Sequence, residues 1–380
     1  MTEINMPISI LEFGSTHVRV AIYDKLIPNQ NLFYEQKINF TGNDFLNENH
    51  PVFDLIMKAE KKIGQHLNEV LLVLDNPSIS SLDFSIQKNF EQKIVSKEDL
   101  DYLVNECEQI IKSYNKEKNI IHVIISSITY DGKNIESPES ISSEVEKVTI
   151  EIKFILIDKK DFDRIKNLLL KKHISLLNVF CTSYIKSLGL LNKLSISNYS
   201  SFIDIGLKKS SLTIYKDNKL LYLNNTHIGG SHITKDISKV LKIDIRKAEA
   251  EKLKFSKRNK LENNSKDREL LKNIVNARLE EIIELLFMDC PLIKNNIFDD
   301  NLKLFFTGNG SKVLNENLLS FGSELNFIKE MTIIEENKED CCKSAIKFNN
   351  SKETIQPKKS SIIIENKGFF EKLFDFFTPK

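Results

Sequence analysis

Two stretches of the chain share one order of residue types, and this repetition limits the possible folds more than any other feature of the sequence. Residues 7–23 (PISILEFGSTHVRVAIY) and 201–215 (SFIDIGLKKSSLTIY) each contain an apolar run that ends in an acid and a glycine, a short polar turn, and a second apolar run. Each apolar run has the length and composition of a buried β-strand. Together the stretches predict two similar halves, each built on a β-hairpin.

The turn of each hairpin is suited to a phosphate group. Gly206 in the second hairpin has no Cβ, so its backbone can adopt a positive φ and approach a ligand closely. Backbone N–H groups that converge in such a turn favour an anion. The corresponding donors in the first hairpin are Gly14, Ser15 and Thr16. Taken alone, each hairpin is better explained by a turn that only closes it.

An acid precedes each glycine at the end of an apolar run. Asp204 is placed to hold a hydrated Mg²⁺ beside a phosphate, because carboxylate oxygens are preferred ligands of this ion. Glu12 is the second candidate metal ligand. Hydrolysis of a nucleotide needs a positioned water and base, and the sequence identifies no catalytic residue.

Further glycine turns occur in the second half of the chain. Gly229-Gly230 leads into a helix predicted through residues 236–241. Thr307-Gly308-Asn309-Gly310 follows a strand predicted at 302–306 and precedes a helix predicted at 313–319. The N-terminus of a helix after such a turn is a good place for phosphate or adenosine.

The other segments predict an α/β protein with an inserted block. Residues 78–157 have a β-helix-β-β pattern, in which Ser96 and Asp99 predict a capping box before a helix with apolar Leu100, Leu103, Val104 and Cys107. Around this block the apolar spacing predicts a strand at 70–74 and helices at 49–67, 159–173, 178–192 and 270–287.

Composition excludes several classes of protein. The net charge is +1 with 28% charged residues, so the chain lacks the global basic field of a nucleic-acid binder. The five cysteines form no CxxC pair, which predicts free, mostly buried thiols in a reducing cytoplasm. The seven histidines have no ligand spacing and are interpreted as incidental. Neither a signal peptide nor a membrane-spanning run is expected.

The C-terminal segment predicts a membrane anchor. Residues 349–367 are polar and read as a flexible linker. The following residues place their apolar side chains on one helical face and Glu371, Lys372 and Asp375 on the other. An amphipathic helix of this kind lies in a membrane interface, while docking of the helix onto the protein or a partner remains an alternative. The apolar residues are Phe369, Phe370, Leu373, Phe374, Phe376 and Phe377.

These motifs, in this order, resemble the FtsA family of bacterial cell-division proteins in the actin and Hsp70 superfamily. Residues 11–15 (LEFGS) are similar to the family's first phosphate motif, and residues 203–206 (IDIG) to the start of the second. Residues 230–237 resemble its GNxxTxDI segment, residues 248–252 its AEAxK segment, and Thr307-Gly308 its adenosine motif. The resemblance covers nearly the whole chain.

The resemblance implies an α/β, actin-like two-lobed ATPase fold with ribonuclease H-like halves and an inserted α+β 1C (SHS2-like) subdomain. The implied parts are lobe IA at 1–77, 158–181 and 341–350, the 1C subdomain at 78–157, lobe IIA at 182–226 and 302–340, subdomain IIB at 227–301, a linker at 351–367 and a membrane-targeting helix at 368–380.

It also implies that ATP and Mg²⁺ bind between the lobes. In the family, the Glu and Lys of the AEAxK helix lie by the ribose and base of the nucleotide, which points to Glu249 and Lys252 here. The full set of implied nucleotide contacts is Gly14, Ser15, Thr16, Asp204, Gly206, Gly229, Gly230, Glu249, Lys252, Gly308 and Gly310.

The implied function is that of an adaptor with little or no catalysis. FtsA-like proteins bind ATP, polymerise head to tail and tether FtsZ filaments to the cytoplasmic face of the inner membrane at the septum. They bind the C-terminal tail of FtsZ on subdomain IIB, where Arg278 matches a basic position in the tail-binding helix. A solvated helix face is the other interpretation of Arg278. Further division proteins are possible partners.

The chain departs from the family at the second phosphate motif. Leu207 and Lys208 replace two glycines and Lys209 replaces a threonine, which restricts the approach of the backbone to a phosphate and weakens nucleotide binding. Lys208 and Lys209 are expected to form a solvated turn; the alternative is that one of them supplies positive charge in place of backbone N–H groups. Two other functions stay open: an adaptor of another membrane assembly, similar to PilM of type IV pilus assembly, and an active ATPase or kinase of the same fold.

Overall fold

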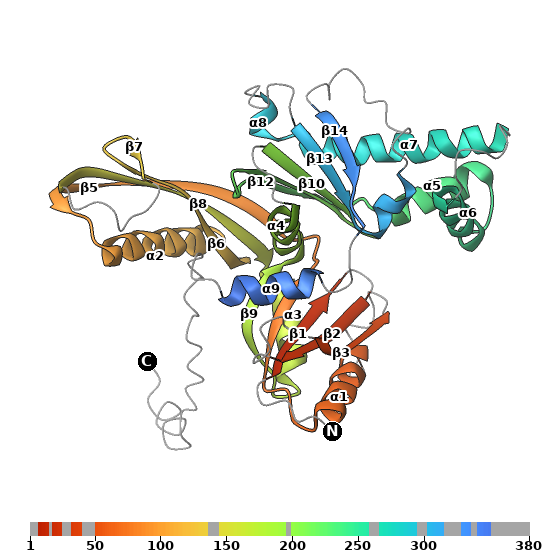
Figure 1. The fold of residues 1–380 in the computed structure, drawn as a ribbon, viewed down its shortest axis with the longest axis horizontal. Coiled ribbons are helices and arrows are strands. Elements are labelled where there is room, and N and C mark those ends of the chain that lie inside the picture. The colour runs from red at the N-terminus through yellow and green to blue at the C-terminus, as the bar shows by residue number, and fades with distance from the viewer. Residues whose placement is uncertain are drawn as a thin grey trace, which may run out of the picture. The chain divides into compact units, whose positions relative to one another are not determined.

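The computed structural model describes residues 7–14, 17–24, 32–39, 50–135, 144–194, 199–257, 266–294, 302–314, 328–335 and 340–350. The described residues fall into two compact units. The first unit extends to Leu82, resumes at Glu117–Asn119, and continues from Ile155 to the last described residue. The second comprises Asp83–Lys116 and Ile120–Phe154. Figure 1 shows the elements of both units.

The first unit contains two five-stranded sheets with the same topology. The first sheet has the order β3-β2-β1-β4-β9 and the second has the order β12-β11-β10-β13-β14. In each sheet a central hairpin is antiparallel, and its first strand pairs in parallel with the next strand of the sheet. This confirms the prediction of two similar halves built on hairpins.

The first sheet is formed by strands from three regions of the chain. Its hairpin pairs Glu12 with Arg19 directly across the two strands. Its interior is apolar, with Ile10, Leu11 and Val20 fully buried. The strands are β1 (Pro7–Phe13), β2 (His17–Asp24), β3 (Leu32–Asn39), β4 (Glu69–Leu74) and β9 (Ser175–Cys181).

Three helices belong with the first sheet: α1 (Pro51–Ile63), α3 (Lys159–Leu170) and α9 (Asp340–Asn350). In α1, the His50 side chain accepts a hydrogen bond from the Val52 amide, and the helix ends at Gly64 in the left-handed conformation. In α9, the Phe348 ring packs edge-on against Phe180 and Tyr184. These contacts bring the end of the described chain back to the first sheet.

The second sheet is covered by the long helix α7. Val275, Leu279 and Ile282 of this helix join one buried cluster with Ile203 and Leu212 of the hairpin. The strands are β10 (Tyr199–Ile205), β11 (Ser210–Lys216), β12 (Lys219–Thr226), β13 (Leu302–Thr307) and β14 (Ile328–Ile333). The helices are α4 (Thr182–Leu194), α5 (Gly230–Leu241), α6 (Ile245–Lys257), α7 (Lys266–Phe287) and α8 (Pro291–Lys294).

A four-stranded sheet with the order β5-β8-β6-β7 carries the helix α2 on one face (Figure 1). Its elements are β5 (Ser80–Ile94), α2 (Lys97–Tyr114), β6 (Lys118–Tyr130), β7 (Lys133–Asn134) and β8 (Glu144–Asp158). The predicted β-helix-β-β order and the capping box of Ser96 and Asp99 are confirmed. The predicted apolar positions of α2 are buried: Leu100, Leu103, Val104 and Cys107.

Two predicted helices differ at their first residues. The helix expected at 178–192 begins at Thr182, because residues 178–181 pair with β4 as the end of β9. Of the helix expected at 313–319, Val313 ends the short 3₁₀ helix η3 (Asn309–Val313) and Leu314 has extended backbone. Residues 315–319 lie outside the described residues. Strand pairing overrode the helical apolar spacing in the first case.

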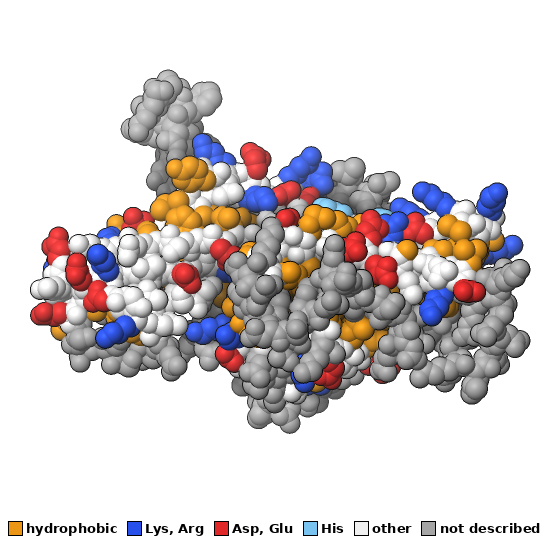
Figure 2. Space-filling view, turned by 90° about the horizontal axis from the view of Figure 1, so that it is seen from above, with side chains coloured by type: hydrophobic (Ala, Val, Ile, Leu, Met, Phe, Trp, Pro, Cys, Tyr) orange, Lys and Arg blue, Asp and Glu red, His pale blue; other side chains and the backbone are white. Residues whose placement is uncertain are grey.

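Two other properties follow from the composition. All five cysteines are free and buried, as predicted. On the face drawn in Figure 2, Lys and Arg side chains are interspersed with Asp and Glu side chains. In the part of the chain that the structure describes, the longest helices are too short or too polar to cross a bilayer.

The capping box of α2 provides a test of the local structure. Ser96 Oγ accepts the Asp99 amide at 3.2 Å, and Asp99 Oδ2 accepts the Ser96 amide at 2.9 Å. Ser96→Ala should destabilise the first turn by about 1 kcal/mol, and its amides should exchange with deuterium about fivefold faster. Ser96→Asp is the matched control, because aspartate also caps helices, and it should leave exchange near the wild-type rate. Equal exchange in Ser96→Ala and wild type would contradict this role.

Candidate functional site

The second hairpin turn is closed by the chain's own backbone. Gly206 follows β10, and its N–H donates to the Lys209 carbonyl at 2.9 Å. A Cβ on Gly206 would lie 2.9 Å from that carbonyl oxygen, which is closer than side chains normally approach. Close packing in the turn therefore requires a glycine at this position.

The other glycine turns of the second half converge on Gly206. Gly230 N donates to the Gly206 carbonyl at 2.9 Å, and Ser231 N donates to the Leu207 carbonyl at 2.8 Å. Gly308 has a φ of +87°, and a Cβ there would collide with the Asp204 carboxylate and the Ile205 carbonyl. Cβ atoms on Gly229 and Gly310 would also press on carbonyls of residues 205–207. The structure thus brings together three turns that are distant in sequence.

Glu249 and Lys252 lie beside these glycine turns. Lys252 is buried, and its Nζ lies 2.8 Å from Thr234 Oγ1, 3.1 Å from the Gly230 carbonyl and 2.7 Å from Glu249 Oε2. Thr234 Oγ1 in turn donates to Glu249. The AEAxK-like helix α6 is therefore anchored to the start of α5 through one buried lysine.

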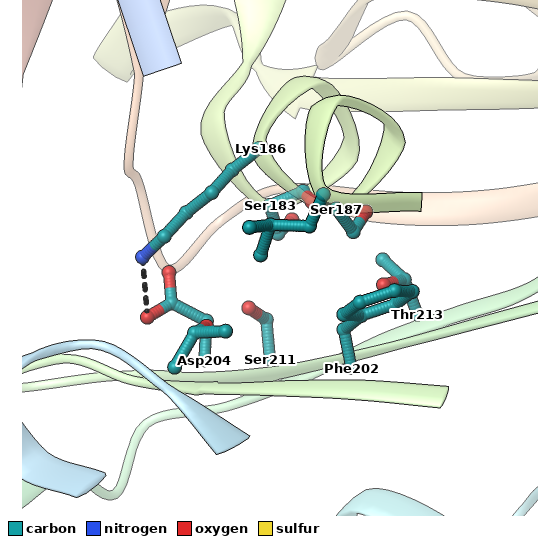
Figure 3. A pocket seen from close by; sticks show the side chains of 9 residues that line it. Ser183, Lys186, Ser187, Phe202, Asp204, Ser211 and Thr213 are labelled. Carbon is teal, nitrogen blue, oxygen red and sulfur yellow. Dashed lines mark hydrogen bonds and ion pairs between the residues drawn. The ribbon is translucent and has the colours of Figure 1, made fainter. Parts of the chain in front are cut away.

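Asp204 is paired with a lysine that the sequence analysis missed. Lys186 of α4 places Nζ 2.9 Å from Asp204 Oδ1 (Figure 3). Both side chains line a narrow space that has no room for a water molecule. The space is also lined by hydroxyls, those of Ser183, Ser187, Ser211, Thr213 and Thr307. The only sequence signal for Lys186 is a cation among small and apolar residues on a helix.

Lys209 is buried, and the expectation that residues 208 and 209 form a solvated turn is wrong for this residue. Lys208 is exposed, whereas Lys209 is 2% exposed and its Nζ lies 2.6 Å from Asp75 Oδ1. Burial alone would lower the pKa of Lys209, but the negative charge of Asp75 outweighs it and raises that pKa. The pairing makes burial of the ammonium tolerable.

Asp75 in turn contacts the first sheet. It follows β4, and its amide donates to the Phe13 carbonyl at the end of β1 at 2.8 Å. The Asp75–Lys209 ion pair therefore connects two places. One is the end of β1, just before Gly14, and the other is the turn of the second hairpin. No spacing in the sequence points to this pair.

Glu12 of the first hairpin is also neutralised within the chain. Its carboxylate lies 3.3 Å from Arg19 Nη1 and 3.7 Å from His17 Nε2. Burial alone would raise the pKa of Glu12, but the hydrogen bond from His17 and the charge of Arg19 lower it overall. The His17 ring lies over Gly14, so this histidine is not incidental to the hairpin. Ser15 and Thr16 lie outside the described residues.

The acids at these turns do not fit a hydrated Mg²⁺. Glu12, Asp75 and Asp204 each have a cation of the chain within 4 Å, which repels a divalent ion and competes for the carboxylate oxygens. The described residues also contain no cluster of three or more histidines, cysteines or acids that could hold a metal ion. The proposal of Asp204 and Glu12 as metal ligands therefore finds no support in their surroundings.

Arg278, the predicted partner-binding residue, is held by two acids. Its Nε lies 2.6 Å from Asp236 Oδ2 of α5, and Nη1 pairs with Glu281 one turn along α7. The hydrogen bond that Arg278 donates to Asp236, followed by the charges of both acids, raises the pKa of Arg278. The six apolar residues of the predicted membrane helix, from Phe369 to Phe377, lie outside the described residues.

The chain is similar to cell-division proteins in sequence. The model of the family described as Cell division protein FtsA matches residues 201–349. Cell division protein FtsA of Helicobacter pylori (strain 26695) is 24% identical over 141 residues, covering 37% of this chain and 28% of that protein. Its counterpart in Agrobacterium fabrum is 19% identical over 250 residues, covering 60% of this chain and 55% of that protein. The matches thus span about half the length of these relatives or less.

The fold is also found among solved structures. A chain of the PilM-PilN type IV pilus biogenesis complex superposes with a TM-score of 0.57 at 14% identity, covering 88% of this chain and 89% of that chain. At this identity the similarity shows the fold alone. The predicted actin-like α/β fold is confirmed.

The Glu12 cluster provides a test that depends on pH. Glu12→Gln removes the buried carboxylate beside Arg19, which keeps Glu35 at 3.4 Å from its Nε, and should lower the free energy of unfolding by about 2 kcal/mol at neutral pH. Because the pKa of Glu12 is lowered in the folded protein from its ordinary value of 4.5, this contribution is present above that pH and is lost as the pH falls through the lowered pKa. Urea unfolding followed by circular dichroism measures it.

The exposed Glu69 at the start of β4 offers a matched control. Glu69→Gln should change the stability by less than about 0.5 kcal/mol at every pH. A cost of Glu12→Gln that equals that of the control, or that does not shrink in acid, would refute the ion-pair assignment.

Proposed function

We propose that this chain, an FtsA-like protein with the actin fold, is a cell-division adaptor that binds ATP, self-associates and tethers FtsZ filaments to the cytoplasmic face of the inner membrane at the septum. The observation that carries the proposal is the FtsA family match over residues 201–349. The matched region includes the second hairpin, the converging glycine turns, α6 with Lys252, and α7 with Arg278. It thus contains most of the candidate site.

Nucleotide binding is supported by the convergence of the glycine turns. The segment 204–207, which includes Gly206, packs against Gly230, Gly308 and Gly310. Lys252 and Glu249 lie beside it. In this proposal the adenosine lies near α6 and the phosphates near the hairpin turns, with Gly14, Ser15 and Thr16 completing the site from the first hairpin. The protein acts by binding the nucleotide and hydrolyses it slowly or not at all, since the acids near the turns are already paired with cations.

Subdomain IIB, proposed at residues 227–301, is the site for the FtsZ tail. Arg278 of α7 pairs with Asp236 of α5 in this region, and its side chain is 23% exposed. An acidic group of a peptide could replace Asp236 or Glu281 as the ion-pair partner of Arg278, because partly exposed ion pairs are weak. Docking of a helical or extended tail into a groove follows a common mode of peptide recognition.

This site can be tested with one substitution. Arg278→Ala should weaken the binding of a labelled FtsZ C-terminal peptide about fivefold, the loss of one partly exposed charge interaction of about 1 kcal/mol. Fluorescence anisotropy measures the affinity. Lys272→Ala, at an exposed position of the same helix, is the matched control and should bind as wild type. If both variants bind like wild type, Arg278 has no part in the contact.

Membrane attachment is proposed for residues 368–380. Burying each of the phenylalanine or leucine side chains in the interface contributes about 1.5–3 kcal/mol. Lys367, Lys372 and Lys380 add about 1 kcal/mol each near anionic lipid, and Glu371 and Asp375 oppose this. The polar residues 351–367 serve as the linker between this helix and the actin fold.

Co-sedimentation with anionic liposomes tests the tether. The full chain should pellet with liposomes and carry FtsZ with it, whereas a chain that ends at Asn366 should stay in the supernatant. Phe370→Asp/Phe374→Asp should behave like the truncated chain, because two charges on the apolar face oppose insertion. Glu371→Gln, on the polar face, is the matched control and should still pellet. Supernatant fractions of equal size for the full and truncated chains would rule out this anchor.

A second candidate function rests on the structural similarity to a chain of the PilM-PilN complex, which extends over 88% of this chain. An adaptor for a different membrane assembly has the same fold, and fold alone does not decide between them. Capture of FtsZ by the full chain in a pull-down favours the division role. The third possibility, an active ATPase or kinase, requires a steady rate of hydrolysis that Asp204→Ala abolishes.

A further inference from the structure

Three carboxylates near the two hairpins form one electrostatic cluster with cations of the chain. The pairs are Glu12 with Arg19 at 3.3 Å, Asp204 with Lys186 at 2.9 Å, and Asp75 with Lys209 at 2.6 Å. The pairs also influence one another. Burial raises the pKa of Glu12, His17 and Arg19 lower it, and Lys186 adds a smaller lowering. Asp204 likewise adds a smaller part to the raised pKa of Lys209, after burial and Asp75.

The two lysines of the cluster are largely withdrawn from solvent. The side chain of Lys209 is 3% exposed and that of Lys186 is 12% exposed. A buried ammonium is stable only when it is paired, and a surface pair with long flexible side chains would contribute little. The burial therefore shows that each lysine has a fixed position at its carboxylate.

Lys186 occupies the position beside Asp204 that a metal ion would need. Its Nζ lies 2.9 Å from Asp204 Oδ1, and the narrow space that both side chains line with Ser183 and Ser211 has no room for a hydrated ion (Figure 3). An ammonium offers three donors and one positive charge without the strict octahedral geometry of Mg²⁺.

Lys209 completes the charge balance at the second hairpin. It occupies a position where the resemblance leads one to expect a threonine, and it neutralises Asp75 between the first sheet and the turn. With Asp75 and Asp204 both neutralised, an anion that approaches the turns meets no net negative charge from these two acids. A divalent ion that approaches them finds both carboxylates already paired with ammonium groups.

We propose that Lys186 and Lys209 take the place of the divalent cation beside Asp204 and Asp75, so that the site binds the phosphate groups of a nucleotide without a metal ion. This inference rests on the nucleotide binding proposed above. It assigns Lys186 to the phosphate side of Asp204 and Lys209 to the neutralisation of Asp75. Neither residue is given a catalytic step.

Binding of the fluorescent analogue TNP-ATP to the full chain, in excess MgCl₂ and in excess EDTA, tests the proposal. The Kd of the wild type should differ by less than about twofold between the two buffers. Lys186→Gln exposes Asp204 to a metal ion, so this variant should bind at least about tenfold more weakly in EDTA than in MgCl₂. A wild-type protein that itself needs Mg²⁺, or a Lys186→Gln variant that does not, would overturn the proposal.

Two further variants control the comparison. Lys193→Gln removes an exposed lysine from the same helix, and Lys186→Arg keeps the positive charge. Both should bind TNP-ATP equally in the two buffers, like the wild type. A requirement for Mg²⁺ in Lys186→Arg would contradict the role of the charge. Circular dichroism of each variant checks the fold, and if Lys186→Gln does not fold, the wild-type and Lys186→Arg results decide the matter.

Binding of Mn²⁺ alone separates this proposal from that of nucleotide binding. Electron paramagnetic resonance of free Mn²⁺ should show no binding to the wild type, binding to Lys186→Gln, and loss of it in Lys186→Gln/Asp204→Asn. If the wild type fails to bind TNP-ATP in both buffers, the proposed nucleotide function is wrong, and the Mn²⁺ result still tests the lysines. Wild-type binding of Mn²⁺ that Asp204→Asn abolishes, or no gain in Lys186→Gln, would overturn their role.

Discussion

Pairing of buried carboxylates with cations of the same chain is the interaction on which the region between the hairpins depends. An acid at the end of a buried strand has lost much of its hydration and must gain a partner. In the first hairpin the partner lies directly across the strands, since Glu12 and Arg19 are in register. In the second hairpin the partner of Asp204 comes from the helix α4.

This requirement explains why the departures from the glycine-rich motif are tolerated. Leu207 and Lys208 cannot let the backbone approach a phosphate as a glycine does, but the neighbouring ammonium of Lys209 satisfies Asp75, which is hydrogen-bonded to the end of β1. Lys209 therefore makes the turn part of the connection to the first sheet. Close packing is kept at Gly206, Gly229 and Gly308, where a Cβ would strike neighbouring backbone or the Asp204 carboxylate.

The sequence and structural similarities concern different parts of the molecule. The FtsA family match covers the second sheet and the helices α5 to α8, whereas the structural similarity to a chain of the PilM-PilN complex extends over both sheets. A fold shared by adaptors of different assemblies directs attention to the surfaces that meet partners. In the proposed function those are the α5–α7 face with Arg278 and the apolar residues near the C-terminus.

Local features were predictable from the sequence because their causes lie within a few residues. The two hairpins, the capping box at Ser96 and the burial of the cysteines follow from periodicity, capping chemistry and side-chain type. The partners Lys186 and Asp75, the burial of Lys209 and the start of α4 at Thr182 were decided only by the tertiary structure. The physical reason is that ion pairing and strand pairing depend on groups far apart along the chain, which no local pattern records.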